Sequence, residues 1–452
     1  MSVGGEAPAD AVGERVPSSR GMGFGLRTIR RLAASDVLDR VRARKGVERA
    51  LFRATKGGLR SATVAGRTFK AAKQLGRPAR QRPSSSGGLF DLTPDDEQAL
   101  IQEAVRRFAA AEVRPAASAA DAVVCAPSVI LTQVNELGVN LLGVPEELGG
   151  AMHPQAAVTA ALVAEALGHG DMGIAYAALA PGAVATAIGR WGTADQQASY
   201  LPSFAGSDPP VGALATLEPG PLFDPLRLRT RAHLQGGSWI LDGAKALVAR
   251  AGECELFVIA ADATGVGPAL FLLESGAPGL SVQPEPAMGL RAAATGRLLL
   301  ERVRVPQDAV LGDGAREVYL ESVQRARIAW CALSVGAAQA VLDYVTPYVN
   351  ERTAFGEPIA NRQAVAFAVA DAAIETGGMR LATYRAASLA DQQRDFGRAA
   401  ALARALCARH GMRIGSEGVQ LLGGHGFTKE HPVERWYRDL RAAGVMEGAL
   451  LV

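Results

Sequence analysis

The sequence predicts an α+β fold in which a helical domain, a small antiparallel β domain and a second helical domain follow one another behind a basic N-terminal extension. The chain has 452 residues, enough for two to four domains, and 48% of them are hydrophobic. Helical periodicity dominates the first part of the body, short β-rich runs between Gly, Pro and Asp turns follow, and helical periodicity then returns. We therefore expect an extension over residues 1–88 and domains over 89–208, 209–313 and 314–452.

Charge separates the extension from the rest of the chain. Through residue 90 there are 19 Lys and Arg against 6 Asp and Glu, a net charge of +13, whereas the remainder has 29 against 39, a net charge of −10. Amphipathic helices are predicted over about 35–56 and 62–75, and residues 83–88 have the composition of a flexible joint. Such an arm suits a transit peptide, a nucleic-acid-binding segment, or a contact with an anionic membrane or an acidic surface.

The acidic residues within this arm (residues 1–88) favour contact with an anionic membrane or an acidic surface. Asp36, Asp39 and Glu48 lie inside its best helix, which is unnatural for a transit peptide, and no recognition motif for nucleic acid accompanies the basic charge. We expect no nucleic-acid partner. We expect a cytoplasmic protein with peripheral membrane or partner contact through the arm; a transit peptide would instead place the protein in the mitochondrial matrix.

Cysteine and histidine usage indicates neither disulfides nor a metal site. The cysteines are Cys125, Cys254, Cys331 and Cys407. They form no CxxC pair and no cluster with the six histidines at metal-ligand spacing, so we expect no bound metal. No apolar run reaches 18 residues, because Glu165, His169 and Asp171 interrupt the stretch 156–188; a membrane-spanning helix is therefore not expected.

The first helix of the body is predicted to follow Thr93, the expected N-cap. Pro94 suits the first helical position, and Asp96 completes a pattern like a capping box. The expected buried face consists of Leu100, Ile101, Val105 and Phe108.

The densest group of motifs lies at the C-terminal end, where residues 420–448 read QLLGGHGFTKEHPVERWYRDLRAAGVMEG. This segment resembles the signature of the acyl-CoA dehydrogenases, flavoenzymes that introduce an α,β double bond into acyl thioesters. The resemblance implies that Glu447 is the catalytic base that removes the α proton. Gly448 would let the substrate approach the backbone, and the apolar neighbours Val445 and Met446 suit a base in a closed site. The family's cofactor is FAD, which accepts the β hydride that no side chain can accept.

A second motif, ERTAFGEPIANRQ at residues 351–363, resembles the family's RxxFGxxIxxxQ. There the Arg and Gln reach the FAD diphosphate of a neighbouring subunit, and a guanidinium suits a diphosphate because its donors meet anionic oxygens in pairs. The glycine-rich turn lines the adenosine end of the same FAD. The resemblance therefore implies a homodimer or homotetramer. The residues implied in this half of the FAD site are Arg352, Phe355, Gln363, Gln420, Gly423 and Gly424.

The acyl-CoA itself is implied to meet Arg327, which aligns with an arginine near the CoA side of the family's site. A solvated helix face is the alternative explanation of this arginine. Some family members carry the catalytic glutamate just before this arginine. Here that residue is Ala326, so this position offers no alternative to Glu447 as the base.

The flavin loop departs from the family's pattern. Residues 217–224 read LEPGPLFD where the family reads about TEPxxGSD, so Leu217 replaces a hydroxyl residue and Phe223 replaces the serine at the diphosphate. The later W-x-T segment, which meets the isoalloxazine, is LVA at 247–249. Backbone N–H groups of Thr216, Leu217 and Phe223 remain as candidate ligands of the flavin.

The resemblance covers residues 89–452 and implies helical, β and four-helix-bundle domains in that order. The favoured function is a FAD-dependent acyl-CoA dehydrogenase that passes electrons to an electron-transfer flavoprotein-type acceptor. Two alternatives stay open. One uses an acyl carrier protein substrate or reoxidation by oxygen, and the other is a flavin-poor binding paralogue suggested by the altered loop. Glu447, Arg352 and Gln363 together favour catalysis, because a non-catalytic subunit has no need of all three.

Overall fold

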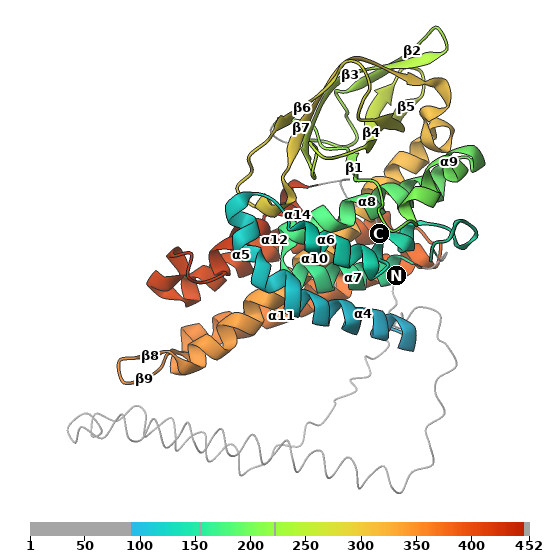
Figure 1. Ribbon diagram of the computed structural model, residues 1–452. Coiled ribbons are helices and arrows are strands. Elements are labelled where there is room, and N and C mark those ends of the chain that lie inside the picture. Colours follow the sequence, from blue (N-terminus) through green and yellow to red (C-terminus); the bar gives the residue numbers. More distant parts are fainter. Residues whose placement is uncertain (1–91, 153–155, 221–222, 447–452) are drawn as a thin grey trace, which may run out of the picture. The chain divides into compact units, whose positions relative to one another are not determined.

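The computed structural model describes residues 92–152, 156–220 and 223–446 (Figure 1). The basic extension and the two expected substrate-side residues Glu447 and Gly448 lie outside these residues. Within them, helices, a sheet and a second set of helices follow one another in the predicted order, which confirms the α+β fold.

The first helix begins later than predicted. Asp95, not Thr93, is the N-cap of α4: its carboxylate accepts the Gln98 N–H at 2.8 Å, and the Gln98 side-chain oxygen accepts the Asp95 N–H at 3.2 Å. Thr93 was the wrong choice because Gln98, three residues after Asp95, can return the hydrogen bond and complete the capping box. Asp96 then falls in the first turn, where a negative charge suits the helix dipole.

The buried face of α4 is also narrower than predicted. Val105 is buried, and Ile101 and Phe108 lie at the edge of the core, but Leu100 is 70% exposed. The helix contacts the rest of the protein on one side only, so Leu100, one residue before Ile101, turns away from the core.

The N-terminal helical part ends before the sheet. Its elements are α4 (Asp96–Phe108), the π-helical turn η1 (Ala109–Val113), α5 (Arg114–Val123), α6 (Ser128–Glu136), the short η2 (Val139–Gly143) and η3 (Glu146–Leu148), α7 (Ala157–Gly170), α8 (Met172–Trp191) and α9 (Ala194–Phe204).

Small residues let α7 pack closely against the long helix α10 (Arg316–Glu351). Gly168 and Gly336 lie at this contact, where an added Cβ would overlap the backbone of the other helix. The carboxylate of Glu165, buried in the same layer, accepts hydrogen bonds from Tyr384 Oη at 2.7 Å and Arg380 Nε at 2.9 Å, both on α11 (Gln363–Asp391). These contacts fasten the N-terminal helices to the C-terminal ones.

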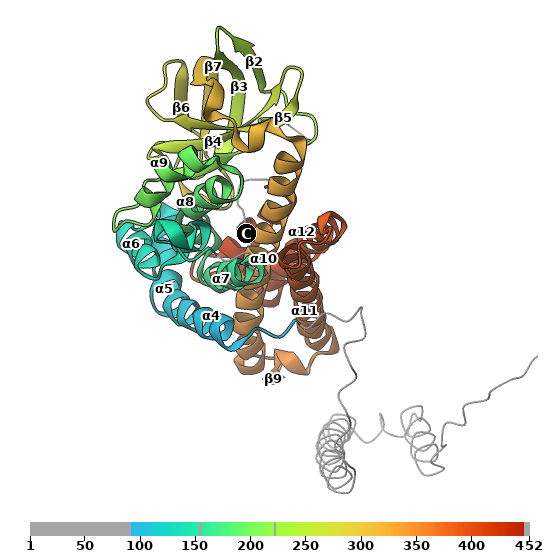
Figure 2. The same cartoon turned by 90° about the vertical axis from the view of Figure 1, so that its right-hand side faces the viewer.

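The middle part is a seven-stranded sheet, mostly antiparallel, that lies at one end of the helical body (Figures 1 and 2). Its strands are β1 (Gly212–Ala215), β2 (Arg231–Gln235), β3 (Ser238–Val248), β4 (Leu256–Ala263), β5 (Gly267–Glu274), β6 (Leu280–Pro284) and β7 (Gly296–Pro306). The order is β1-β4-β2-β3-β7-β6, with β5 on β4, and β4 pairs in parallel with β1 and with β2. Short 3-10 turns, η4 (Arg291–Ala293), η5 (Gln307–Ala309) and η6 (Leu311–Gly314), flank β7.

The C-terminal part contains, among the described residues, three long helices followed by two short ones. They are α10, α11 (Gln363–Asp391), α12 (Gly397–Leu421), α13 (Val433–Asp439) and α14 (Ala442–Val445); the small hairpin β8 (Thr353–Ala354) and β9 (Glu357–Pro358) and the turns η7 (Ile359–Asn361) and η8 (Gly423–Phe427) connect them. Two described helices, α8 and α10, are long and apolar enough to cross a membrane, but in each 78% of the apolar window is buried within the fold, as in the core helices of a folded domain.

Candidate active site

A pocket of about 490 Å³ lies where the β8–β9 hairpin meets the η8 turn. Its lining brings together five residues that the sequence motifs imply for one end of FAD, although the two motifs are more than 50 positions apart in the chain. These five are Arg352, Phe355, Gln420, Gly423 and Gly424. Tyr348, Arg362, Glu417 and His425 also line the pocket.

Local backbone geometry presents the hairpin side of this pocket. The N–H of Arg352, which ends α10, donates to Tyr348 O at 2.8 Å, and its carbonyl accepts the Ile359 N–H at 2.9 Å. Between the two short strands, Phe355 and Gly356 both have positive φ, 55° and 83°, as a two-residue hairpin turn requires. A bulky residue rarely adopts such a backbone, and Phe355 is moreover 94% exposed. The chain thus holds an aromatic ring in solvent at a conformational cost.

The glycines of η8 have different causes. An added Cβ at Gly426 would overlap the Val419 carbonyl, so packing within the chain requires that glycine. At Gly424 an added Cβ would meet open space, and φ is not in the left-handed region. Neither packing nor backbone conformation within this chain therefore explains why residue 424 is a glycine. The missing side chain leaves open space at this wall of the pocket.

Two other predicted residues lie outside this lining. Gln363 is the first residue of α11 and is exposed. Arg327 is half-buried on α10.

The flavin loop follows β1 in the sheet domain. Thr216 and Leu217 are buried, the Leu217 carbonyl accepts the Ala246 N–H at 2.9 Å, and Phe223 is half-buried against the core. No side chain at 217 or 223 can therefore supply the polar group that the family pattern has there. What this loop offers in their place is backbone and apolar surface.

A buried ion pair holds the loop. Glu218 accepts the Arg229 and Thr230 N–H groups at 2.7 and 2.9 Å and the Lys245 ammonium at 2.9 Å, and both charged side chains are almost fully buried. Burial lowers the pKa of Lys245 to about 8. Burial would raise the pKa of Glu218, but Lys245 and the two N–H groups outweigh it and lower that pKa.

Leu247, at the position of the flavin-packing segment, is held in a left-handed conformation with φ 51°. Its N–H donates to Glu285 Oε2 at 2.6 Å, and its carbonyl accepts the Tyr176 hydroxyl at 2.9 Å. Two partners from different elements thus stabilise a strained backbone, which is common at functional sites.

The two predicted halves of the FAD site lie at opposite ends of the described residues. Both ribbon views place the β8–β9 hairpin at the far end of the helices from the sheet that carries the flavin loop (Figures 1 and 2). One copy of the chain does not bring Arg352 and Leu217 to the same ligand.

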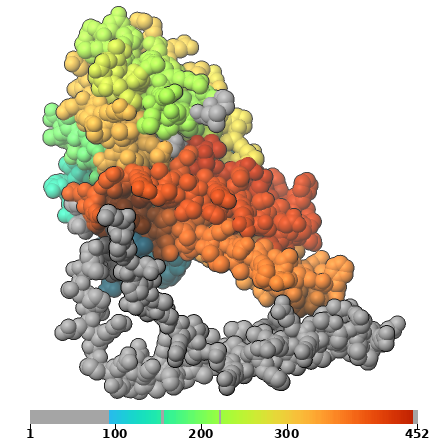
Figure 3. Space-filling view, turned by 180° about the vertical axis from the view of Figure 1, so that it is seen from behind, coloured from blue at the N-terminus to red at the C-terminus, as the bar shows by residue number. Residues whose placement is uncertain are grey.

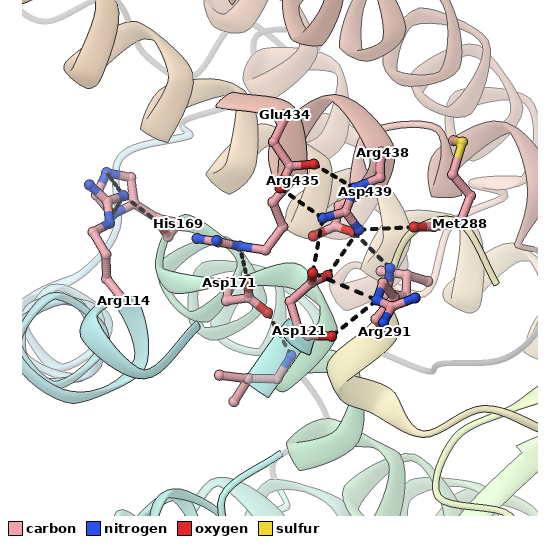
Figure 4. A network of polar contacts seen from close by, with 12 residues as sticks. Arg114, Asp121, His169, Asp171, Met288, Arg291, Glu434, Arg435, Arg438 and Asp439 are labelled. Carbon is pink, nitrogen blue, oxygen red and sulfur yellow. Dashed lines mark hydrogen bonds and ion pairs between the residues drawn. The ribbon is translucent and has the colours of Figure 1, made fainter. Parts of the chain in front are cut away.

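A polar network fixes α13, the helix that precedes α14 and Glu447 in the chain (Figure 4). Arg438 donates two hydrogen bonds to the Asp121 carboxylate, at 2.9 and 3.0 Å, and another to the Met288 carbonyl at 2.9 Å. Arg291 from η4 also donates to the Asp121 carbonyl at 3.0 Å. The network therefore joins α5, the loop before β7 and α13.

Beside it lie two buried carboxyl groups. Asp171 caps α8 by accepting the Ile174 N–H at 2.9 Å and pairs with Arg435 Nε at 3.0 Å, while Asp439 accepts the Leu290 N–H at 2.6 Å. Burial raises the pKa of both, and for Asp439, beside the Asp171 charge, the pKa rises to about 8. Burial beside a second carboxylate therefore favours the protonated form of Asp439.

Sequence reasoning missed the residues that support the site rather than contact a ligand. Glu285 and Tyr176 support Leu247, Lys245 pairs with Glu218, and Asp171 lies beside Asp439. A lone polar residue within an apolar strand or helix, such as Lys245 in β3, is the signal that indicates a buried partner.

Comparison with known proteins agrees with these features. Family models for the N-terminal, middle and C-terminal domains of acyl-CoA dehydrogenase match residues 95–208, 213–303 and 312–450. The mitochondrial short-chain specific acyl-CoA dehydrogenase of Bos taurus is 32% identical over 367 residues, 78% of this chain and 87% of that protein. A probable acyl-CoA dehydrogenase of Bacillus subtilis is 33% identical over 370 residues, 79% of this chain and 96% of that protein.

A solved structure extends the likeness to three dimensions. The glutaryl-CoA dehydrogenase of Mycobacterium smegmatis in complex with FADH2 superposes with a TM-score of 0.70 at 26% identity, covering 77% of this chain and 90% of that one. Three consecutive domain matches in the order of the observed helices, sheet and helices leave one assignment: the chain belongs to the acyl-CoA dehydrogenase family, whose members bind FAD.

Proposed function

We propose that this protein is a FAD-dependent acyl-CoA dehydrogenase that oxidises the Cα–Cβ bond of an acyl-CoA thioester. The observation that carries the proposal is the pocket at the hairpin, which joins Arg352 of one motif to Gln420 and Gly424 of another. Two motifs that are distant in the sequence thus line one pocket, which the side chains of a single copy leave open.

The residues present fit the diphosphate and adenosine end of FAD. Arg352 supplies a guanidinium for an anionic diphosphate, and the open space at Gly424 leaves room for a ligand against the backbone. The sheet domain would hold the isoalloxazine end through backbone and apolar groups around Leu217 and Leu247. Bound there, FAD would supply an acceptor for the hydride that the substrate's β carbon loses.

Glu447 is the proposed base for the α proton. It follows directly on Met446, which is buried, and comes shortly after α13, which the Arg438 network holds. A carboxylate near apolar groups is a better proton acceptor than one in water, because burial disfavours its charged form. Arg327 is the proposed contact for the CoA side.

The base is tested with Glu447→Gln. This change keeps the shape of the side chain but removes the proton acceptor, so the variant is expected to bind acyl-CoA while its flavin is reduced at least about 100-fold more slowly. Stopped-flow bleaching of the flavin by a panel of acyl-CoAs measures this rate. Near-wild-type reduction would show that another group takes the proton.

We further propose a homo-oligomer in which FAD lies between copies of the chain. The separation of the two half-sites supports this. So does an apolar stripe on α11, where Phe367, Ile374 and Leu381 are all more than half exposed at spacings of seven residues. Figure 3 shows the side of the protein on which the C-terminal part of the chain, coloured orange and red, forms much of the surface. Electrons would leave for an electron-transfer flavoprotein-type acceptor.

Arg352→Ala tests the shared site. Because it removes charge-assisted hydrogen bonds to the diphosphate, the variant is expected to purify with less flavin absorbance and unchanged helical content. Arg398→Ala, an exposed arginine on α12 outside the pocket, is the matched control. A fully flavinated Arg352→Ala protein that sediments as a monomer would contradict both the cofactor contact and the oligomer. A colourless wild-type protein that still binds acyl-CoA would favour the flavin-poor paralogue.

A further inference from the structure

Three potential metal ligands gather beside the pocket. His425 lies in η8, and Glu430 and His431 lie in the segment between η8 and α13. One ligand atom from each, two imidazole nitrogens and a carboxylate oxygen, lie within 4.8 Å of one another. The sequence spacing gave no sign of this cluster, because it is the segment between η8 and α13 that brings the His431 ring to 5.7 Å from the His425 ring.

Packing orients His431 for ligation. Its Nδ1 lies 2.7 Å from the Tyr344 hydroxyl, and its ring meets Tyr344, Tyr348 and His425 edge-on at centroid distances of 5.9, 5.9 and 5.7 Å. The Tyr344 hydroxyl oxygen can accept a hydrogen bond from Nδ1–H of His431. A hydrogen bond at one ring nitrogen that leaves the other available is the usual support of a metal-bound histidine.

The ligand set selects among cations. Two imidazoles and one carboxylate suit zinc and other late first-row metals, whereas magnesium and calcium prefer oxygen ligands alone. Ligands of tetrahedral zinc at about 2.0–2.2 Å from the ion are about 3.3–3.6 Å apart, so the side chains must close by roughly 1 Å. His425 and Glu430 are exposed and can make this adjustment by rotation, while His431 stays in place.

We propose that His425, Glu430 and His431 bind a zinc ion, with a fourth position open to water or a ligand. Bound metal would join η8 to the start of α13 and so fix the turn that forms one wall of the pocket. His425 also lines the pocket proposed for FAD, so the test reads zinc binding itself and not enzymatic activity.

The test is zinc titration of the full-length protein, freed of any histidine tag, in competition with a chromophoric chelator. Wild type is expected to bind one zinc ion per chain at this site, in the presence of excess magnesium. His425→Asn and His431→Asn each remove a ligand and should weaken binding by more than the about 10- to 100-fold that loss of a supporting partner causes. Tyr344→Phe, which removes only that support, should weaken it by about 10- to 100-fold.

His233→Asn, a histidine on β2 far along the chain, is the matched control and should bind zinc as the wild type does. Circular dichroism and melting temperature establish that each variant is folded, and the exposed position of His425 makes its variant the decisive one. Unchanged zinc affinity in folded His425→Asn, equal binding of magnesium, or no binding by wild type at micromolar zinc would each overturn the proposal.

Discussion

Asp439→Asn is expected to change how the stability of this protein depends on pH. The Asp439 side chain is buried, and its Oδ1 accepts the Leu290 N–H at 2.6 Å, a hydrogen bond that an asparagine oxygen can also accept. The substitution therefore removes a titrating group and keeps the packing. Asp171, whose charge disfavours ionisation of Asp439, is unchanged.

The magnitude follows from the pKa. Burial raises the pKa of Asp439 from an ordinary 3.8 to about 8. Between these values the unfolded chain has lost this proton and the folded chain has kept it. The contribution of Asp439 to the free energy of unfolding is therefore fully present below about pH 4 and is lost as the pH rises toward 8. At about 1.4 kcal/mol per pH unit, the loss between pH 5 and pH 8 is about 4 kcal/mol. Asparagine does not titrate, so the variant lacks this loss.

Thermal or denaturant unfolding of both proteins at several pH values between 5 and 8 measures the effect. Other titrating groups are common to both, so the quantity compared is the difference between variant and wild type. Between pH 5 and pH 8, the free energy of unfolding of Asp439→Asn should rise by about 4 kcal/mol relative to that of the wild type. Asp208→Asn, an exposed acid before β1, should show no such shift. If the Asp439 difference is constant to within about 1 kcal/mol, Asp439 is ionised throughout and the reasoning from its burial is wrong.

Three further outcomes are expected. Gly424→Ala should leave the melting temperature unchanged but lower flavin retention, whereas Gly426→Ala, whose added methyl overlaps backbone, should lower the melting temperature; equal effects on both readouts would contradict the pocket assignment. Glu218→Gln leaves the buried Lys245 ammonium without its carboxylate partner and should lower the free energy of unfolding by about 3–5 kcal/mol. Lys245→Met should lower it less, because Glu218 keeps its two N–H donors; the reverse order would show that the ammonium is not the costly group. Deletion of residues 1–88 should abolish salt-sensitive sedimentation with anionic liposomes; identical, salt-insensitive behaviour of both proteins would remove the membrane role.

Local patterns predicted the order of the elements because periodicity and turn residues act over a few positions. The short β-rich runs between turn residues became the strands of the sheet, β4 among them. Pairings between distant polar residues had no such local sign. The Glu218–Lys245 pair depends on how β3 packs against the loop, and the pKa of Asp439 depends on Asp171 from another domain. The N-cap at Asp95 was missed for a smaller reason, since two capping patterns, one from Thr93 to Asp96 and one from Asp95 to Gln98, overlap in the sequence.

Residues that are energetically unfavourable in one copy of the chain support the proposal that a second copy binds there. Phe355 is held at positive φ with its ring in solvent, Gly424 is a glycine that neither packing nor backbone conformation within the chain requires, and an apolar stripe on α11 stays uncovered. Backbone strain, exposed apolar groups and the extra conformational entropy of an unneeded glycine are each unfavourable for an isolated chain. All three become favourable if another copy, with FAD on its sheet domain, packs against this end. The same surface then accounts for the motif, the strain and the exposed apolar groups, whereas a monomeric enzyme would leave each of them unexplained.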